Sequence, residues 1–270
     1  NPPSLAAALV WIHAPRRESD AIAARKRFAF EEIFLIQLDR ATRRETYQSQ
    51  RAHRVEVAEE KLESFTKRLP FPLTRAQNLA IETVIKDMNN DRPMARLLEG
   101  DVGSGKTVVA AAAAYAAVLS GSEVAYMVPT EILARQHFES FIANFAGLNI
   151  NIGLLTGGDC RKFPSKIPAR IERDSMRSGG TPRTHTTISR SQLLKWVANG
   201  EIPILIGTQT LIQKTVRWKQ LGLTIIDEQH RFGVMQRKRL VKQGEKAARP
   251  AVPHLLSMTA TPIPRTLALT

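Results

Sequence analysis

One eight-residue stretch limits the folds open to this chain more than any other, the sequence Gly-Asp-Val-Gly-Ser-Gly-Lys-Thr at residues 100–107. Its three glycines let the backbone curl until several N–H groups point at one anion, and a Cβ at such positions would block the approach. We expect a short buried strand over residues 95–99 before the loop and an alanine-rich helix over residues 106–119 after it, whose N-terminus adds partial positive charge. The stretch therefore predicts a phosphate-binding loop in an α/β nucleotide-binding domain.

The side chains of this loop have separate expected tasks. The Lys106 ammonium is expected to neutralise the β- and γ-phosphates, and the Thr107 hydroxyl to complete the coordination shell of Mg²⁺. The expected nucleotide-binding residues of the loop are Gly100, Asp101, Val102, Gly103, Ser104, Gly105, Lys106 and Thr107. A chance match is improbable, because a strand and a helix are expected where such a loop requires them.

An Asp-Glu pair follows the apolar strand expected over residues 223–226. Asp227 would hold Mg²⁺ through water, and Glu228 is the adjacent candidate base that activates the attacking water. An acidic pair alone would usually be a solvated loop, but behind a β-favouring strand and downstream of a phosphate loop the catalytic interpretation is favoured. Lys106, Asp227 and Glu228 are therefore the expected catalytic residues, and Thr107 and Asp227 the expected metal ligands.

Short apolar segments alternate with helical ones from residue 71 onward. Helices are expected over residues 75–88, 106–119 and 131–145, and strands over residues 95–99, 123–128, 150–155, 202–206, 223–226 and 255–258. Short apolar strands separated by helices are typical of a parallel sheet covered on both faces. Residues 1–70 instead show helical periodicity up to Pro70, with too few large apolar residues after Tyr47 to bury a core. We expect one long helix there that packs on a neighbour.

The chain is strongly basic, with 39 Lys and Arg against 25 Asp and Glu and a formal net charge of +14. Such an excess favours an anionic partner, first of all nucleic acid, although a merely soluble basic protein would look the same. Residues 157–190 break the α/β alternation with a sequence rich in Ser, Thr, Pro, Gly and Arg. Between Gly158 and Lys195, nine basic and three acidic residues contribute six of the net charges. We expect either an added DNA-binding arm or an insertion without function.

Other sequence features exclude several classes of protein. The longest apolar run, residues 108–119, is too short to span a bilayer, and no signal peptide is visible, so no membrane partner is expected. The single Cys160 excludes an internal disulfide and a multi-cysteine zinc site, which fits a reducing cytosol. The chain begins at Asn1 rather than Met and ends directly after a motif, so we expect a piece of a longer protein.

Five segments, in chain order, resemble motifs I, Ia, Ib, II and III of superfamily-two helicases. They are residues 100–107, 129–133, 207–209, 227–230 and 259–266. Residues 24–32, 73–77, 93–98, 231–234 and 267–270 are further similar to the RecG family of branched-DNA helicases. The resemblance covers nearly the whole chain except residues 158–190. Its preference for RecG over the related transcription-repair coupling factor rests on Ser104, Glu131, Ile132 and Gln229.

The resemblance implies roles for single residues outside the phosphate loop. Gln77 would read the adenine edge, since an amide can both donate and accept. The residues implied to contact the DNA backbone are Thr130, Arg135, Thr208 and Gln209. The residues implied to couple the γ-phosphate state to DNA binding are Thr259 and Thr261, with His230 as a link from the nucleotide to a moving part. Arg265 belongs to the third motif and is not assigned as an arginine finger.

For the whole chain, the resemblance implies a helical linker from a missing upstream wedge domain over residues 1–70. Residues 71–270 would form the first RecA-like motor domain, a P-loop NTPase fold with a parallel sheet flanked by helices. The implied activity is ATP- and Mg²⁺-dependent helicase action on branched DNA, such as forks and four-way junctions, in recombination and repair. A monomeric motor in the bacterial cytoplasm, associated with the nucleoid, is implied.

The second RecA-like domain, which completes the ATP site of this family with an arginine, is expected to be absent from the chain. The isolated piece is therefore expected to hydrolyse ATP weakly or not at all. Two alternatives stay open at this point. One is the motor of a transcription-repair coupling factor, and the other is a DNA-binding module whose ATP site is a non-hydrolysing switch.

Overall fold

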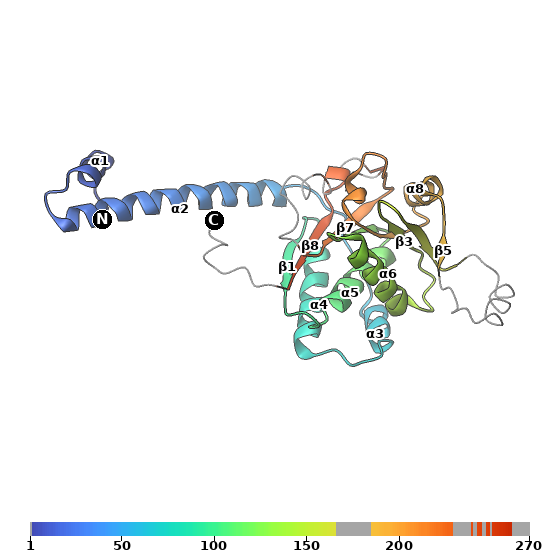
Figure 1. Cartoon of the computed structure of the whole chain (residues 1–270). Coiled ribbons are helices and arrows are strands. Elements are labelled where there is room, and N and C mark those ends of the chain that lie inside the picture. The colour runs from blue at the N-terminus through green and yellow to red at the C-terminus, as the bar shows by residue number, and fades with distance from the viewer. Residues whose placement is uncertain are drawn as a thin grey trace. The chain divides into compact units, whose positions relative to one another are not determined.

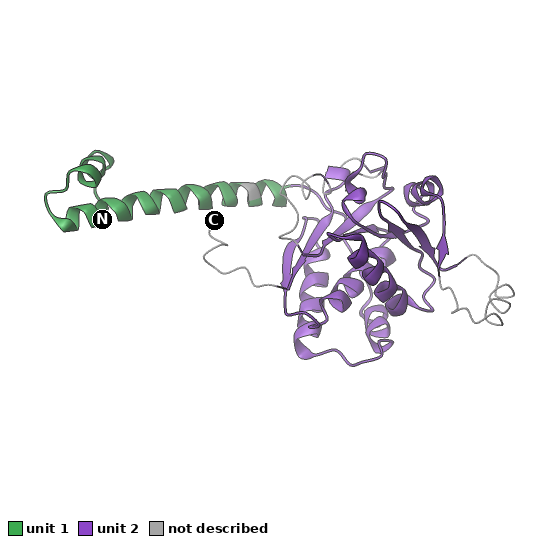
Figure 2. Ribbon diagram, in the orientation of Figure 1, with its two compact units in different colours: residues 1–49, 263–270 green, residues 50–262 purple. Residues whose placement is uncertain are grey.

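The computed structural model describes residues 2–165, 185–228, 239, 242–244, 247–248 and 250–260, apart from the side chain of residue 43. These residues form two compact units, residues 2–49 and residues 50–260, which Figure 2 shows in different colours. Each unit has helices and buried residues of its own.

The first unit is a pair of helices. They are α1 Leu5–His13 and α2 Glu18–Gln48 (Figure 1). The two helices pack against each other, and Ala8 of α1 and Ala24 of α2 are fully buried. Arg27 Nη1 of α2 donates a hydrogen bond to the Pro3 carbonyl oxygen at 2.6 Å, which holds the chain before α1 against α2. Alanines at these positions allow the two backbones to approach closely without a large apolar interface.

The predicted long N-terminal helix is confirmed as α2, but the expectation that it continues to residue 70 is wrong. α2 ends at Gln48, and α3 Glu59–Lys67 is a separate helix. Residues 51–58 between them have no regular secondary structure, and the N–H of the fully buried Val55 donates to the Met88 carbonyl oxygen at 2.9 Å. Val55 and Val57 lie two residues apart, and this spacing suits an extended segment that buries one face.

α3 belongs to the core of the second unit. Phe65 is 1% exposed and stacks on Tyr115 with ring centroids 4.7 Å apart, and it also contacts Phe145. The boundary between the two units therefore falls after Ser49 rather than at residue 70.

The second unit contains one eight-stranded sheet with the strand order β1-β8-β7-β2-β6-β3-β4-β5. Its strands are β1 Ala95–Glu99, β2 Glu123–Met127, β3 Ile152–Leu155, β4 Cys160–Phe163, β5 Thr186–Thr187, β6 Ile204–Gly207, β7 Leu221–Ile226 and β8 His254–Thr259. The six neighbouring strands from β1 to β3 run parallel, whereas β4 and β5 are antiparallel to their neighbours. The predicted parallel sheet is confirmed for six strands, and the antiparallel pair extends it at one edge.

Helices cover both faces of this sheet. They are α4 Arg75–Met88, α5 Lys106–Leu119, α6 Glu131–Phe145 and α8 Arg190–Ala198, with the short 3₁₀ helix η1 Gln209–Ile212. Along β2, Val124 and Tyr126 pack with α4, α5 and α6, whereas Ala125 and Met127 pack with α8 and η1. Figure 1 shows these two sets of helices on opposite sides of the sheet. Because both faces are buried, the strand reads as a continuous apolar run.

β1 is an exposed edge strand, not the buried strand that we expected. Four of its five residues are exposed, and Leu97 is 47% accessible. Among the described residues β1 pairs with β8 alone. The apolar sequence of a strand cannot reveal whether it has a neighbour on one side or on both.

The basic segment over residues 157–190 includes regular secondary structure. β4 and β5 pair with each other within it, and α8 begins at its last residue, Arg190. Arg161 Nη2 of β4 forms an ion pair with Asp159 at 2.7 Å, so part of the basic charge is locally compensated. Residues 166–184 lie outside the described residues, and the DNA-binding arm stays a prediction. None of the described helices combines the length and the apolar character needed to cross a membrane.

Candidate active site

Three strand ends meet at one edge of the sheet. β1 leads into the loop of residues 100–107, β7 leads into Asp227, and β8 ends at Thr259. β8 lies between the other two strands, and Glu99 at the end of β1 pairs directly with Thr259. Parallel α/β sheets bind their ligands at the carboxyl ends of neighbouring strands. The sheet therefore brings the phosphate loop and the Asp-Glu pair to one site.

The phosphate loop turns through two left-handed corners. Gly103 has φ +81° and Gly105 has φ +85°, a region that residues with a Cβ rarely adopt. Gly105 is the N-cap of α5, so the loop passes directly into the helix. The first N–H groups of a helix lack intrahelical partners, and this turn is therefore suited to bind an anion.

Lys106 lies folded onto the loop that it follows. Its Nζ donates hydrogen bonds to the carbonyl oxygens of Gly100 at 2.6 Å and Asp101 at 2.8 Å. Both acceptors are uncharged, so these bonds orient the ammonium without neutralising it. A cation held in this way beside a helix N-terminus fits the binding of a phosphate group.

Gln77 connects α4 to the phosphate loop. Its Oε1 accepts a hydrogen bond from the Thr74 N–H at 2.8 Å, as part of a capping box, and its Nε2 donates to the Ser104 carbonyl oxygen at 2.9 Å. A Cβ on Gly105 would lie 2.2 Å from Gln77 Nε2, so the amide occupies the space that this glycine leaves. Both ends of the amide bond to the protein, and reading adenine would require them to exchange partners.

Asp227 and Glu228 form a tight corner after β7. Asp227 is 8% exposed, and its Oδ1 accepts a hydrogen bond from the Glu228 N–H at 2.9 Å. Glu228 has φ +50°, which is uncommon for a residue with a side chain and often marks a functional site. The corner therefore combines an uncommon backbone conformation with a backbone hydrogen bond to one oxygen of the Asp227 carboxylate.

Two residues that the sequence analysis missed complete the surroundings of Asp227. His137 Nε2 of α6 lies 2.8 Å from Asp227 Oδ2, and the Tyr126 hydroxyl of β2 lies 3.0 Å from His137 Nδ1. Burial raises the pKa of the Tyr126 hydroxyl, and the negative charge of Asp227 raises it further. The available signal was a tyrosine among the apolar residues 124–128, since a buried hydroxyl needs a hydrogen-bonding partner.

The residues implied in coupling divide between described and undescribed parts of the chain. Thr259 is 1% exposed, and its carbonyl oxygen accepts a hydrogen bond from the Gly100 N–H at 3.4 Å. The end of β8 therefore contacts the first residue of the phosphate loop. His230 and Thr261 lie outside the described residues, as does Gln229, and their roles stay predictions.

The predicted metal ligands suit Mg²⁺ bound together with a nucleotide. Within the part of the chain that the structure describes, no three His, Cys, Asp or Glu side chains gather into a metal site. Mg²⁺ in nucleotide-binding proteins is held by one or two protein oxygens and the substrate phosphates rather than by a protein cage. One carboxylate at Asp227 and the Thr107 hydroxyl at the start of α5 fit that donor set.

A cavity of about 1020 Å³ adjoins η1. Thr208 and Gln209 of the predicted DNA contacts line it, together with Glu131, Lys214, Arg217 and Lys242. With Arg239, which also lines the cavity, four basic side chains against one acidic side chain give this surface the charge that a phosphate backbone requires. It lies beside the carboxyl end of β6, and Thr208 directly follows that strand.

The other two predicted DNA contacts have partners within the protein. Thr130 is the N-cap of α6, with its hydroxyl oxygen accepting a hydrogen bond from the Leu133 N–H at 3.3 Å. Arg135 forms an ion pair with Asp159 at 3.2 Å and is about half exposed. Neither residue lines the basic cavity, so a DNA contact by either one stays a prediction.

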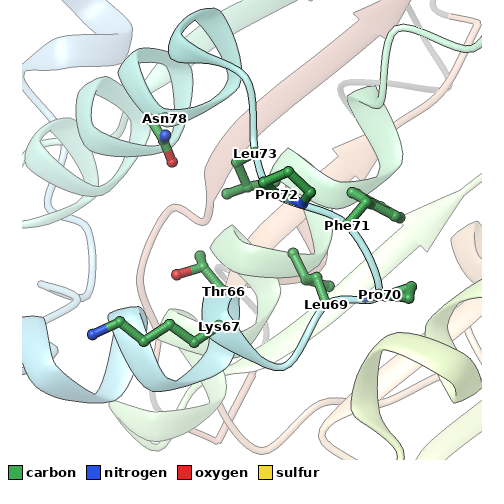
Figure 3. A pocket seen from close by; sticks show the side chains of 8 residues that line it. All are labelled: Thr66, Lys67, Leu69, Pro70, Phe71, Pro72, Leu73 and Asn78. Atoms are coloured by element: carbon green, nitrogen blue, oxygen red, sulfur yellow. The ribbon is translucent and has the colours of Figure 1, made fainter.

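A second cavity, of about 480 Å³, lies between α3 and the start of α4. Figure 3 shows Thr66 and Lys67 of α3, Asn78 of α4 and the apolar residues of the connecting loop around it. Its lining residues include Leu69, Phe71, Pro72 and Leu73, but no residue of the phosphate loop. Its nearest link to the nucleotide site is Gln77, the chain neighbour of Asn78.

Known proteins resemble this chain in sequence and in fold. The ATP-dependent DNA helicase RecG of Aquifex aeolicus is 44% identical over 244 residues, which cover 90% of this chain and 27% of that protein. RecG of Bacillus subtilis is 44% identical over 264 residues, which cover 97% of this chain and 34% of that protein. A solved structure of RecG bound to a three-way DNA junction superposes with a TM-score of 0.70 at 36% identity, covering 97% of this chain and 31% of that one.

The chain thus spans about a third or less of the length of these relatives. Residues 74–270 match the DEAD/DEAH box helicase family, a range that includes α4, the whole sheet and every residue of the candidate active site. This match covers well over half of the sequence and agrees with the similarity to RecG. The chain belongs to the DEAD/DEAH box helicase family.

Proposed function

We propose that this chain is the ATP-binding part of a DNA helicase that acts on branched DNA. The observation that carries the proposal is the meeting of the phosphate loop and the Asp227–Glu228 pair at neighbouring strand ends. The similarity to RecG, and the three-way junction bound in the related structure, support branched DNA as the substrate.

The chain's own residues account for the expected division of labour in hydrolysis. Lys106 would offset the charge on the transferred phosphate, and Thr107 and Asp227 would hold Mg²⁺, which supplies further charge stabilisation when bound. Glu228 would orient the attacking water and accept its proton.

The basic cavity beside η1 supports a DNA backbone contact next to this site. Lys214 and Arg217 can neutralise phosphates, and the exposed Gln209 amide can donate to them. Together with the helicase family, this surface favours a DNA-driven motor over a nucleotide-binding protein of another class. We also propose a monomeric motor in the bacterial cytoplasm, in keeping with the bacterial origin of the relatives.

ATP hydrolysis by the full-length protein and its Glu228→Gln variant tests the proposal. The wild-type protein should hydrolyse ATP faster with branched DNA than with linear duplex of the same length. The variant should lose turnover by at least about 100-fold while it keeps its affinity for a fluorescent nucleotide, because only the base has been removed. A wild-type protein that binds ATP but never hydrolyses it would contradict the motor and favour a switch.

A further inference from the structure

We propose that His137 is a positioning residue that couples the DNA-facing end of α6 to Asp227, and with it to the metal site. The proposal rests on the proposed function, since it assumes that Asp227 holds Mg²⁺ beside the nucleotide. Its core is a three-residue chain that runs from β2 through α6 to the end of β7, made of Tyr126, His137 and Asp227.

The hydrogen-bond directions in this chain are set by its last member. A carboxylate can only accept, so His137 Nε2 carries the hydrogen that lies 2.8 Å from Asp227 Oδ2. In the neutral imidazole, Nδ1 is then free to accept from the Tyr126 hydroxyl at 3.0 Å. The side chains of His137 and Asp227 are only 13% and 11% exposed, so water competes weakly for these bonds.

This contact fixes the orientation of the Asp227 carboxylate. Oδ2 is held by His137, and Oδ1 by the Glu228 N–H at 2.9 Å. Each carboxylate oxygen has a second lone pair, so the group can still accept a metal-bound water in one defined direction. Groups that orient metal ligands in this way typically change metal affinity or activity by about 10–100-fold when they are removed.

α6 connects this contact to the proposed DNA surface. Glu131, in its first turn, lines the basic cavity, and its Oε1 accepts a hydrogen bond from the Gly157 N–H at 2.9 Å. His137 lies six residues further along the same helix, a rise of about 9 Å. A shift of α6 when DNA fills the cavity would therefore move the donor that holds Asp227. The basic cavity and the nucleotide site would then influence each other's affinity reciprocally.

The test measures metal dependence as well as turnover. In the full-length protein, the Mg²⁺ concentration at half-maximal binding of a fluorescent ADP analogue is measured with and without branched DNA. We expect DNA to lower this concentration in the wild type. In His137→Leu the concentration should rise about tenfold, the shift caused by DNA should disappear, and kcat should fall about 10–100-fold, with DNA affinity in the absence of nucleotide unchanged.

Three further variants separate positioning from folding. His137→Gln keeps an N–H donor and should recover part of the metal affinity, and Tyr126→Phe removes only the outer hydroxyl and should give a smaller loss than His137→Leu. Gln136→Ala changes an exposed neighbour on the same helix and should match the wild type. If His137→Leu fails to fold, as judged by its unfolding temperature, the same measurements on His137→Gln and Tyr126→Phe decide the question.

The outcomes distinguish this inference from the proposed function. If the wild type hydrolyses ATP in response to DNA but His137→Leu or its substitutes show an unchanged Mg²⁺ midpoint and an unchanged DNA effect, the coupling role is overturned. An equal loss in Gln136→Ala would overturn it as well. If the wild type shows no DNA-dependent hydrolysis, the proposed function fails and the coupling inference falls with it.

Discussion

At the scale of single residues, two side-chain nitrogens hold the phosphate loop by its carbonyl oxygens. Lys106 Nζ binds the Gly100 and Asp101 carbonyls, and Gln77 Nε2 binds that of Ser104. The loop therefore has a defined shape before any nucleotide arrives. Such preorganisation reduces the ordering cost of binding.

The space above Gly105 gives a direct test of the Gln77 contact. Gly105→Ala should destabilise the protein by about 1–2 kcal/mol through its positive φ angle and by about 1 kcal/mol more because Gln77 must leave Ser104. Gly121→Ala is the matched control, since Gly121 has φ +78° with open space around it. Chemical unfolding measures both. In a Gln77→Ala background the two glycine substitutions should cost the same, and a persisting difference would rule out the clash.

The buried carboxylate of Glu123 predicts a pH effect on stability. Burial raises its pKa to about 7 from the ordinary 4.5, although the Gln220 N–H donates to Oε2 at 2.7 Å. The folded state therefore binds a proton more tightly than the unfolded state, and stability is lost as the pH rises through about 7. Glu123→Gln removes this loss. Relative to wild type, its free energy of unfolding should gain up to about 3 kcal/mol between pH 5 and pH 8.

The titration of His254 does not disturb the comparison of wild type with Glu123→Gln. Burial lowers the pKa of His254, whose Nδ1 accepts from the Met94 N–H, so its effect on stability acts below pH 6.5 and is present in both proteins. It cancels in the difference between wild type and Glu123→Gln. Parallel pH profiles for the two proteins would show that Glu123 is not the group responsible.

At the scale of elements, helices with a clear start signal were predictable to the residue. α4, α5 and α6 have the predicted bounds 75–88, 106–119 and 131–145. The hydroxyls of Thr74 and Thr130 cap α4 and α6, and Gly105 supplies the left-handed turn before α5. Each signal acts within four residues, so no knowledge of the tertiary structure was needed.

Features that depend on a distant partner were not predictable. β4 and β5 were missed because residues 157–190 lack an apolar period, and β4 is defined mainly by its pairing with β3. α8 was missed as well, although its start is marked locally by Ser189, whose hydroxyl accepts a hydrogen bond from the Gln192 N–H. Residues 51–58 are not helical, and the hydrogen bond from the Val55 N–H to the distant Met88 carbonyl that holds them is not visible in the sequence. The bond from His137 to Asp227 joins residues far apart in the chain, which requires the sheet order to be known.

Two basic residues in the loop after η1 should contribute measurably to DNA affinity. Replacing Lys214 and Arg217 with Ala should weaken DNA binding and lower the slope of log affinity against log salt concentration by about 2, as expected for two lost phosphate contacts. Lys61→Ala with Lys86→Ala removes the same charge from exposed positions of α3 and α4 and is the control. Fluorescence anisotropy at several salt concentrations measures both. Equal slopes in the two double variants would indicate that only net charge matters.

At the scale of the whole molecule, the chain covers 27–34% of the length of its RecG relatives. The resemblance to superfamily-two helicases implies that a catalytic arginine comes from a second motor domain. The 270-residue chain alone should therefore bind Mg²⁺ and nucleotide but hydrolyse ATP at least about 10³-fold more slowly than the full-length protein. Steady-state turnover with branched DNA measures the difference. Equal rates would mean that this chain contains every catalytic group.

Because β1 is an exposed edge strand, the nucleotide site should unfold locally before the rest of the sheet does. The strand that carries the phosphate loop pairs, among the described residues, with β8 alone, and the Gly100–Thr259 bond continues that pairing into the loop. Edge strands fray before central ones, so amide hydrogens of Leu97 and Leu98 should exchange with deuterium faster than those of β2. As the temperature rises, the protein should lose its affinity for nucleotide while the rest of the sheet is still folded. A ligand that binds the loop should slow this exchange, so the exchange rate of the β1 amides should report how much of the nucleotide site is occupied.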